Sequence, residues 1–93
     1  MRIISGYLKG KKLELPKDKL TRPLKDMVKE SIFNILTHSK NINIDLRDSI
    51  ILDLFSGSGS FGLECISRGA KHVYFNENYQ KALEVLQKNI QNL

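Results

Sequence analysis

The chain has 93 residues, the size of one small domain, and its 41% hydrophobic and 27% charged residues are typical of a globular chain and exclude a disordered or fibrous one. Its apolar runs are far shorter than the roughly 20 residues that span a bilayer, and no signal-peptide segment is recognisable, so we expect a cytoplasmic protein with no membrane partner. The net charge is +5 and uneven, because residues 1–29 hold nine Lys/Arg against three Asp/Glu, a balance of +6.

The first 20 residues are predicted to form a basic β-hairpin and a connection. Residues 2–5 form a candidate strand, Gly6 and Gly10 bracket a turn, and residues 12–15 alternate polar with apolar side chains before Pro16 ends the return strand. The positive charge of this part suits a phosphate-backbone partner, because each neutralised phosphate releases counterions. A solvated basic surface without a partner is the alternative.

An amphipathic helix is predicted from Pro23 to about His38. The residue before a proline is steered out of the helical region, and proline is favoured at the first position of a helix. Apolar residues then recur at helical spacing and define one buried face, with Phe33 beside it: Leu24, Val28, Ile32, Ile35 and Leu36.

The remaining residues are predicted to follow the order strand, helix, strand, helix. The first strand has little alternation, which is typical of a strand covered on both faces of a parallel sheet. Gly69 suits the residue after the end of the first helix. We expect the four elements at residues 50–55, 61–68, 72–76 and 79–92, joined by a right-handed crossover.

This arrangement predicts an α/β fold that looks cut short. Two parallel strands with one helix after each cannot cover both faces or both edges of a sheet, and purely parallel sheets are almost always buried. Either the chain is a fragment of a larger α/β domain, or another copy or another chain supplies the missing strands.

Metal and disulfide chemistry have no support in the sequence. The single cysteine, Cys65, cannot form an internal disulfide, and we interpret it as helix core. No Cys/His cluster has metal-ligand spacing, and we assign His38 and His72 to ordinary surface or strand-end roles. We therefore predict no metal site.

The clearest functional signal is the run Asp53-Leu-Phe-Ser-Gly-Ser-Gly-Ser-Phe-Gly62. Its three glycines have the spacing G-x-G-x-x-G where a strand turns into a helix, which is the context of a nucleotide-binding turn. Gly57 and Gly59 allow a tight turn and a close approach of the backbone to a ligand, and the helix N-terminus presents unpaired N–H groups to an anion. The spacing alone does not identify the cofactor.

Two acidic residues narrow the choice of cofactor. Asp53 lies in an otherwise apolar strand, where a carboxylate is costly unless it meets a cation, such as the ammonium of a methionine moiety, or several donors. Glu77 lies 15 residues after Gly62 and can accept both hydroxyls of a ribose, which could belong to S-adenosylmethionine (SAM) or to NAD. The alternatives are that Asp53 only caps the following turn and that Glu77 is a surface residue.

The run that begins at Asp53, continued by Leu63-Glu and followed by Ser67-Arg-Gly-Ala, resembles the first SAM-binding motif of the RsmD-type ribosomal RNA methyltransferases. Further segments are similar to that family's opening, in the same order: Met1-Arg-Ile-Ile-Ser-Gly, Leu8-Lys-Gly-Lys-Lys-Leu, Thr21-Arg-Pro and Val28-Lys-Glu-Ser-Ile-Phe-Asn-Ile-Leu. The resemblance covers essentially all 93 residues. It implies the N-terminal portion of a Rossmann-like class I SAM-dependent methyltransferase, which transfers a methyl group to guanine N2 of small-subunit (16S) ribosomal RNA.

The resemblance also implies the site residues. Residues 1–20 would contact the RNA of the assembling small subunit, and residues 21–93 would form the first part of the SAM-binding domain. The implied cofactor-binding residues are Asp53, Phe55, Gly57, Ser58 and Gly59, with Glu77 on the ribose. The predicted RNA-binding residues are Arg2, Lys9, Lys11, Lys12, Lys19 and Arg22, of which Arg22 could instead lie near the cofactor.

The chain departs from the family's pattern in two respects. Asn76 stands where an apolar residue is more usual, and Tyr79 stands where an acidic one is. The family's catalytic motif Asn/Asp-Pro-Pro-Tyr/Phe has no counterpart in these residues, so we assign no catalytic residue and expect this chain alone to be inactive. Two alternatives remain: a non-catalytic SAM- or RNA-binding module that is complete at this length, and a small NAD-binding domain.

Overall fold

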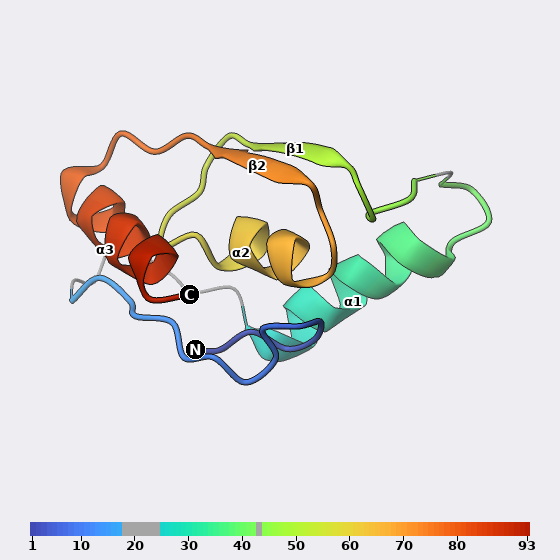
Figure 1. Ribbon diagram of the computed structural model, residues 1–93, viewed down its shortest axis with the longest axis horizontal. Coiled ribbons are helices and arrows are strands. Elements are labelled where there is room, and N and C mark those ends of the chain that lie inside the picture. The colour runs from blue at the N-terminus through green and yellow to red at the C-terminus, as the bar shows by residue number, and fades with distance from the viewer. Residues whose placement is uncertain (18–24, 43) are drawn as a thin grey trace.

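The computed structural model describes residues 1–17, 25–42 and 44–93 (Figure 1). Five elements follow in chain order: α1 (Asp26–His38), β1 (Ile50–Asp53), α2 (Ser60–Ser67), β2 (His72–Phe75) and α3 (Gln80–Gln91). The two strands pair in parallel, with Ile50 opposite His72 and Asp53 opposite Phe75. The predicted order of strand, helix, strand, helix is therefore confirmed. The helix predicted from Pro23 begins only at Asp26, because Lys25 is extended and caps it; Pro23 and Leu24 themselves lie outside the described residues.

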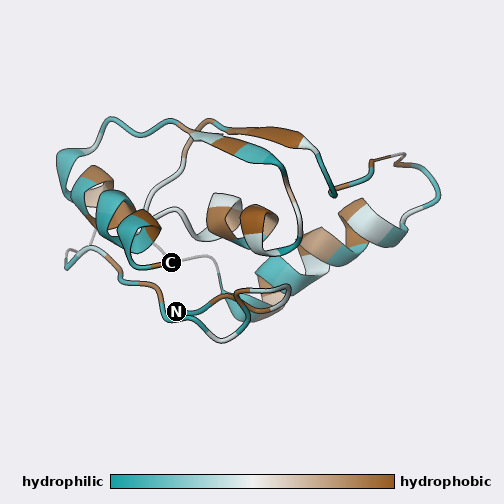
Figure 2. Ribbon diagram, in the orientation of Figure 1, coloured by the Kyte–Doolittle hydropathy of each residue, from teal (hydrophilic) through white to brown (hydrophobic). Residues whose placement is uncertain are grey.

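The two-stranded sheet is covered on one face only. In Figure 1 all three helices lie on the same side of β1 and β2. On the other face Ile50 is 67% exposed and Leu52 is 62% exposed, although β1 is strongly hydrophobic (Figure 2). The prediction that these elements cannot cover both faces of the sheet is therefore confirmed for the described part of the chain, in which the helices reach one face alone.

Two clusters of buried hydrophobic side chains form the core. The first lies between α1, α2 and the covered face of the sheet and contains Phe33, Leu46, Cys65 and Val73. The second joins the N-terminal segment to α2 and contains Ile3, Leu13 and Leu63. Burial, reinforced by the charges of Asp53 and Glu64, raises the pKa of the Cys65 thiol to about 12, so the interpretation of this cysteine as a core residue is confirmed.

The buried face of α1 differs from the predicted one. Lys29 and Phe33 are fully buried, whereas Val28 and Ile35 are exposed. The reason is that α1 turns a charged residue inward to meet Glu64 of α2, with 3.3 Å between Lys29 Nζ and Glu64 Oε1. A stripe drawn through apolar residues alone therefore misplaces the centre of this face.

The N-terminal segment doubles back as predicted, but it does not form a regular hairpin. Arg2 and Lys12 make an isolated antiparallel bridge, and residues 1–17 contain no longer strand. The N–H groups of Ile4 and Ser5 donate to Oε1 and Oε2 of Glu64, at 2.9 and 3.0 Å, and so do not pair with the return segment. A side chain of α2 thus takes the place of a neighbouring strand.

Glu64 is the centre of a buried ion cluster. Besides its contact with Lys29, it accepts a hydrogen bond from Arg68 Nε at 2.9 Å, and the side chains of Glu64 and Lys29 are fully buried. Burial alone would raise the pKa of Glu64, but the N–H of Ile4, the Arg68 guanidinium, the N–H of Ser5 and the Lys29 ammonium together lower it. The carboxylate is therefore held in its charged form.

Replacing Glu64 with Gln should destabilise the protein by about 3 to 5 kcal/mol at neutral pH, because the change leaves Lys29 buried without its counter-ion. Since folding lowers the pKa of Glu64, its contribution is fully present above the ordinary value of 4.5 and is lost as the pH falls through the lower folded value. The difference between Glu64→Gln and the parent in urea unfolding should therefore shrink on acidification. Glu30→Gln, at an exposed position of α1, is the control, and an equal loss in both variants would contradict the assignment.

Candidate cofactor-binding site

A glycine-rich turn joins the carboxyl end of β1 to α2. Gly57 has φ +55° and Gly59 has φ +92°, in the left-handed region that favours glycine. Gly59 is the N-cap of α2, and its N–H donates to the carbonyl of Ser56 at 2.8 Å. The predicted turn is therefore present, and it delivers the chain into a helix N-terminus.

The glycines of this turn have different surroundings. A Cβ added at Gly59 would lie 2.4 Å from Leu86 Cδ1 of α3, and one added at Gly62 would lie 2.4 Å from Phe75 Cε1 of β2. A Cβ at Gly57 would meet nothing within 4 Å. Gly59 and Gly62 thus serve close packing behind the turn, whereas Gly57 faces open space where a ligand can approach the backbone.

Asp53 ends β1 with a carboxylate that is only partly satisfied. Its Oδ2 is buried without a hydrogen-bond partner in the described part of the chain. Burial raises the pKa of Asp53 above 3.8 and the charge of Glu77 adds to the rise, while the N–H groups of Phe55 and Gly62 oppose it. Capping of the turn explains the two N–H contacts and leaves the second oxygen unexplained. A buried acceptor of this kind suits a cationic group.

Glu77 follows β2 and reaches back to the glycine-rich turn. Its Oε1 accepts the N–H of Gly57 at 2.7 Å, and its Oε2 accepts the N–H of Tyr79 at 2.9 Å. A carboxylate has about four acceptor positions, so Glu77 keeps capacity for two hydroxyl groups. Glu77 is therefore not a surface residue without contacts, because it accepts two backbone hydrogen bonds.

The other two predicted cofactor residues lie in opposite environments. The side chain of Phe55 is 90% exposed. Ser58 is buried, and its carbonyl accepts a hydrogen bond from Asn89 Nδ2 at 2.8 Å. The structure therefore brings Asp53 and Glu77 to the two sides of the turn, while Ser58 is engaged from behind by α3.

Sequence reasoning missed two residues that hold the turn. Lys29 Nζ donates to the hydroxyl of Ser60, the first residue of α2, at 3.0 Å, and Asn89 bonds the carbonyl of Ser58. A signal was available in each case, because Lys29 lies four residues before Phe33 and Asn89 lies three residues after Leu86. This spacing places the polar residue on the same face of the helix as the apolar one, which makes it a candidate for burial.

The predicted RNA-contacting residues lie in the N-terminal segment and its connection. Four of them are described by the structure and exposed: Arg2, Lys9, Lys11 and Lys12. The other two, Lys19 and Arg22, lie outside the described residues. Arg2 makes a long contact with Asp26, with 3.4 Å between Nε and Oδ2, and both side chains remain solvent-accessible. Such an exposed pair leaves the arginine available to a phosphate.

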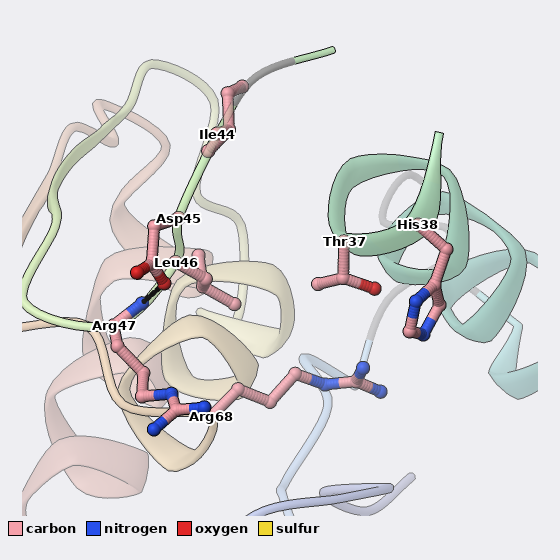
Figure 3. Close-up of a pocket in the computed structure, with 7 residues that line it drawn as sticks. All are labelled: Thr37, His38, Ile44, Asp45, Leu46, Arg47 and Arg68. Carbon is pink, nitrogen blue, oxygen red and sulfur yellow. Dashed lines mark hydrogen bonds between the residues drawn. The ribbon is translucent and has the colours of Figure 1, made fainter. Parts of the chain in front are cut away.

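A separate cleft of about 490 Å³ lies between the end of α1, the segment before β1 and the end of α2 (Figure 3). Its lining includes His38, Arg47 and Arg68, but in Figure 3 the Arg68 side chain extends toward His38, away from the guanidinium of Arg47. The glycine-rich turn lies at the opposite, carboxyl end of the strands. This cleft is therefore not part of the candidate cofactor site.

The described residues contain no group of three or more His, Cys, Asp and Glu side chains that could hold a metal ion. In the same part of the chain, no helix is both long enough and apolar enough to cross a membrane. The acidic side chains that flank the glycine-rich turn are Asp53 and Glu77, and the buried cation behind it is Lys29.

A parallel strand, a glycine-rich turn, a helix and a second strand that is followed by an acid define the chain as an α/β unit of the nucleotide-binding kind. A family model described as "Conserved hypothetical protein 95" matches residues 1–93. The chain belongs to this family, the RsmD family of ribosomal RNA methyltransferases, as the sequence resemblance predicted.

Individual relatives agree with this assignment. The Bacillus subtilis protein YlbH, described as a candidate rRNA methyltransferase, is 41% identical over 93 residues, which are 100% of this chain and 47% of YlbH. Ribosomal RNA small subunit methyltransferase D of Haemophilus influenzae is also 41% identical and is covered to 45%. The solved structure of the Escherichia coli protein yhhF, described as a candidate methyltransferase, matches 99% of this chain and 46% of its own with a TM-score of 0.81 and 34% identity. The chain thus spans about half the length of these relatives.

We predict that Gly59→Ala destabilises the protein more than Gly57→Ala does. Both changes place a side chain at positive φ, which costs roughly 1 to 2 kcal/mol. Gly59→Ala also drives a methyl group into buried Leu86, which adds about 1 to 3 kcal/mol of overpacking. Urea unfolding of the two variants measures the difference, and equal losses would show that Leu86 yields without cost.

Proposed function

We propose that the chain is the SAM-binding, N-terminal part of a methyltransferase that transfers a methyl group from SAM to guanine N2 of small-subunit (16S) ribosomal RNA. Membership of the RsmD family supports the class of reaction and the kind of substrate. The observation that carries the cofactor assignment is Oδ2 of Asp53, which is buried at the carboxyl end of β1 and has no hydrogen-bond partner among the described residues. An rRNA substrate would also give the protein a cytoplasmic location.

The residues around the turn fit the chemical groups of SAM. Asp53 would hold the ammonium of the methionine moiety, because its unpaired oxygen needs a cation or a donor. Glu77 would accept the ribose hydroxyls, and Gly57 would let the ligand approach the backbone. Phe55 presents an exposed ring next to this site. Bound SAM supplies the electrophilic methyl group.

The described residues bind and orient, and we assign none of them to the transfer itself. The exocyclic N2 of guanine is a poor nucleophile, because its lone pair is delocalised into the ring, so the base must be flipped out and held in line with the methyl group. We place no such base-holding group in residues 1–93 and expect this chain alone to be inactive. The contribution of these residues is then the positioning of the methyl donor.

Residues 1–20 would supply the RNA contact. Their exposed basic side chains favour the phosphate backbone of 16S rRNA or of the assembling small subunit, and only one aromatic residue, Tyr7, lies among them. Base recognition by this segment is therefore minor. We expect its affinity for RNA to be strongly dependent on salt and weakly dependent on sequence.

Calorimetry should show binding of SAM or its demethylated product, and weaker or no binding of NAD. Asp53→Asn should weaken SAM binding more than about tenfold, because it removes a buried charge-assisted contact. Since the pKa of unliganded Asp53 is raised, SAM affinity should fall as the pH drops through that value, and this decline should be absent in Asp53→Asn. Asp45→Asn, an exposed change in the distant cleft, is the control. NAD binding as tight as SAM binding would refute the assignment.

RNA affinity measured across a salt series tests the basic segment. If about four of its cations meet phosphates, the log–log slope should lie near −3 to −4, at about 0.7 to 0.9 per contact. Changing Lys9, Lys11 and Lys12 together to Ala should flatten the slope by roughly 2 to 3 units. A triple Ala variant at exposed lysines elsewhere serves as the charge-matched control: Lys71, Lys81 and Lys88. Equal slopes in the two triple variants would show that the basic segment does not bind RNA phosphates and is only a solvated surface.

A further inference from the structure

Asn89 makes an unusual set of buried contacts for a helix residue. It lies on α3 with 2% of its surface exposed. Its Nδ2 donates to the carbonyl of Ser58 at 2.8 Å and to the carbonyl of Glu14 at 3.1 Å, and its Oδ1 accepts the N–H of Glu14 at 2.8 Å. Both N–H groups and one acceptor position of the amide are therefore used, all by main-chain groups of distant segments.

These contacts join the N-terminal segment to the glycine-rich turn. Glu14 offers its N–H and its carbonyl to Asn89 as it would to a neighbouring strand. The same amide then bonds the carbonyl of Ser58, which lies between Gly57 and Gly59. One side chain thus ties two stretches of backbone together, and an apolar residue could not do so.

The bond to Ser58 fixes the orientation of the peptide between Ser58 and Gly59. The carbonyl of this peptide accepts from Asn89, and its N–H donates to the carbonyl of Ser56 at 2.8 Å. Glycine populates positive and negative φ about equally, so Gly59 by itself does not select one orientation. Turning the peptide over would break both bonds and leave the amide of Asn89 unsatisfied in a buried place.

We propose that Asn89 is a positioning residue for the cofactor turn, and that it holds the Ser58–Gly59 peptide in the orientation in which the open side of the turn receives SAM. This inference rests on the proposed SAM site. The open side is formed by Gly57 and Glu77, and the side held by Asn89 faces α3. Asn89 touches no ligand, and its effect on binding passes through the turn.

Two variants, made in the full-length protein, test this role. Asn89→Leu keeps the size of the side chain and removes all its hydrogen bonds. Asn89→Asp keeps the acceptor for the N–H of Glu14 and removes the donor to the carbonyls of Ser58 and Glu14. Leu46→Ala is the matched control, because Leu46 is buried at the other end of the sheet and its loss lowers stability without touching the turn.

SAM affinity is measured by calorimetry at a temperature where unfolding curves show every variant to be folded. Both Asn89 variants should bind SAM at least about tenfold more weakly than the parent, whereas Leu46→Ala should keep the parental affinity. In hydrogen exchange without ligand, the amides of residues 57–60 should exchange faster in the Asn89 variants, and those of β1 and β2 should not. If Asn89 only stabilised the fold, Leu46→Ala would weaken SAM binding as much as the Asn89 variants do, or the Asn89 variants would raise amide exchange equally in residues 57–60, β1 and β2.

The outcomes separate this inference from the proposed function. If the parent binds SAM and the Asn89 variants bind it as tightly, the inference is overturned and the SAM site stands. If the parent does not bind SAM, the proposed function fails, and with it the ligand half of the inference. The exchange of residues 57–60 needs no ligand, and unchanged exchange there would overturn the positioning role by itself.

Discussion

The carboxylate of Glu64 is the constraint on which the arrangement of the N-terminal half depends. A fully buried carboxylate is costly unless cations and donors surround it, and Glu64 meets this requirement with groups from three different parts of the chain. Lys29 comes from α1, Arg68 comes from the end of α2 itself, and the N–H of Ile4 comes from the N-terminal segment. Neither α1 nor the N-terminal segment can therefore move away from α2 without removing a partner from this buried carboxylate.

The same cluster reaches the candidate site. The three donor positions of Lys29 serve Glu64, the carbonyl of Arg2 and the hydroxyl of Ser60, which begins α2 directly after the glycine-rich turn. The ion cluster and the candidate cofactor site are therefore joined through the side chain of Lys29. A change in the ion cluster therefore alters a contact in the first turn of α2. The N-terminus of a helix favours an anionic or polar ligand.

Features that leave a local pattern in the sequence, such as the order of strands and helices, could be predicted, whereas contacts between residues far apart in the sequence could not. The βαβα order follows from apolar runs and glycines, and two acids stand out because Asp53 lies in an otherwise apolar strand and Glu77 follows the next one. The helical spacing of Lys29 and Asn89 from apolar residues places them near the buried face, but it does not identify their partners, which include backbone groups far away in the sequence. The irregular hairpin has the same cause, since nothing near Ile4 indicates that its N–H bonds to a side chain of α2.

The carboxylates of Glu64 and Asp53 have opposite pKa shifts, and the difference follows from the partners that each carboxylate has. At Glu64 the donors and cations outweigh burial and lower the pKa, so that every requirement of the charge is met within the described residues. At Asp53 burial outweighs two backbone N–H groups and raises the pKa, and one oxygen has no partner in the same part of the chain. The described residues therefore satisfy the carboxylate of Glu64 fully, whereas they leave one oxygen of Asp53 without a partner. The open oxygen stands at the carboxyl end of a parallel strand, where α/β proteins bind their ligands, and under the proposed function the ammonium of SAM is the partner that completes it.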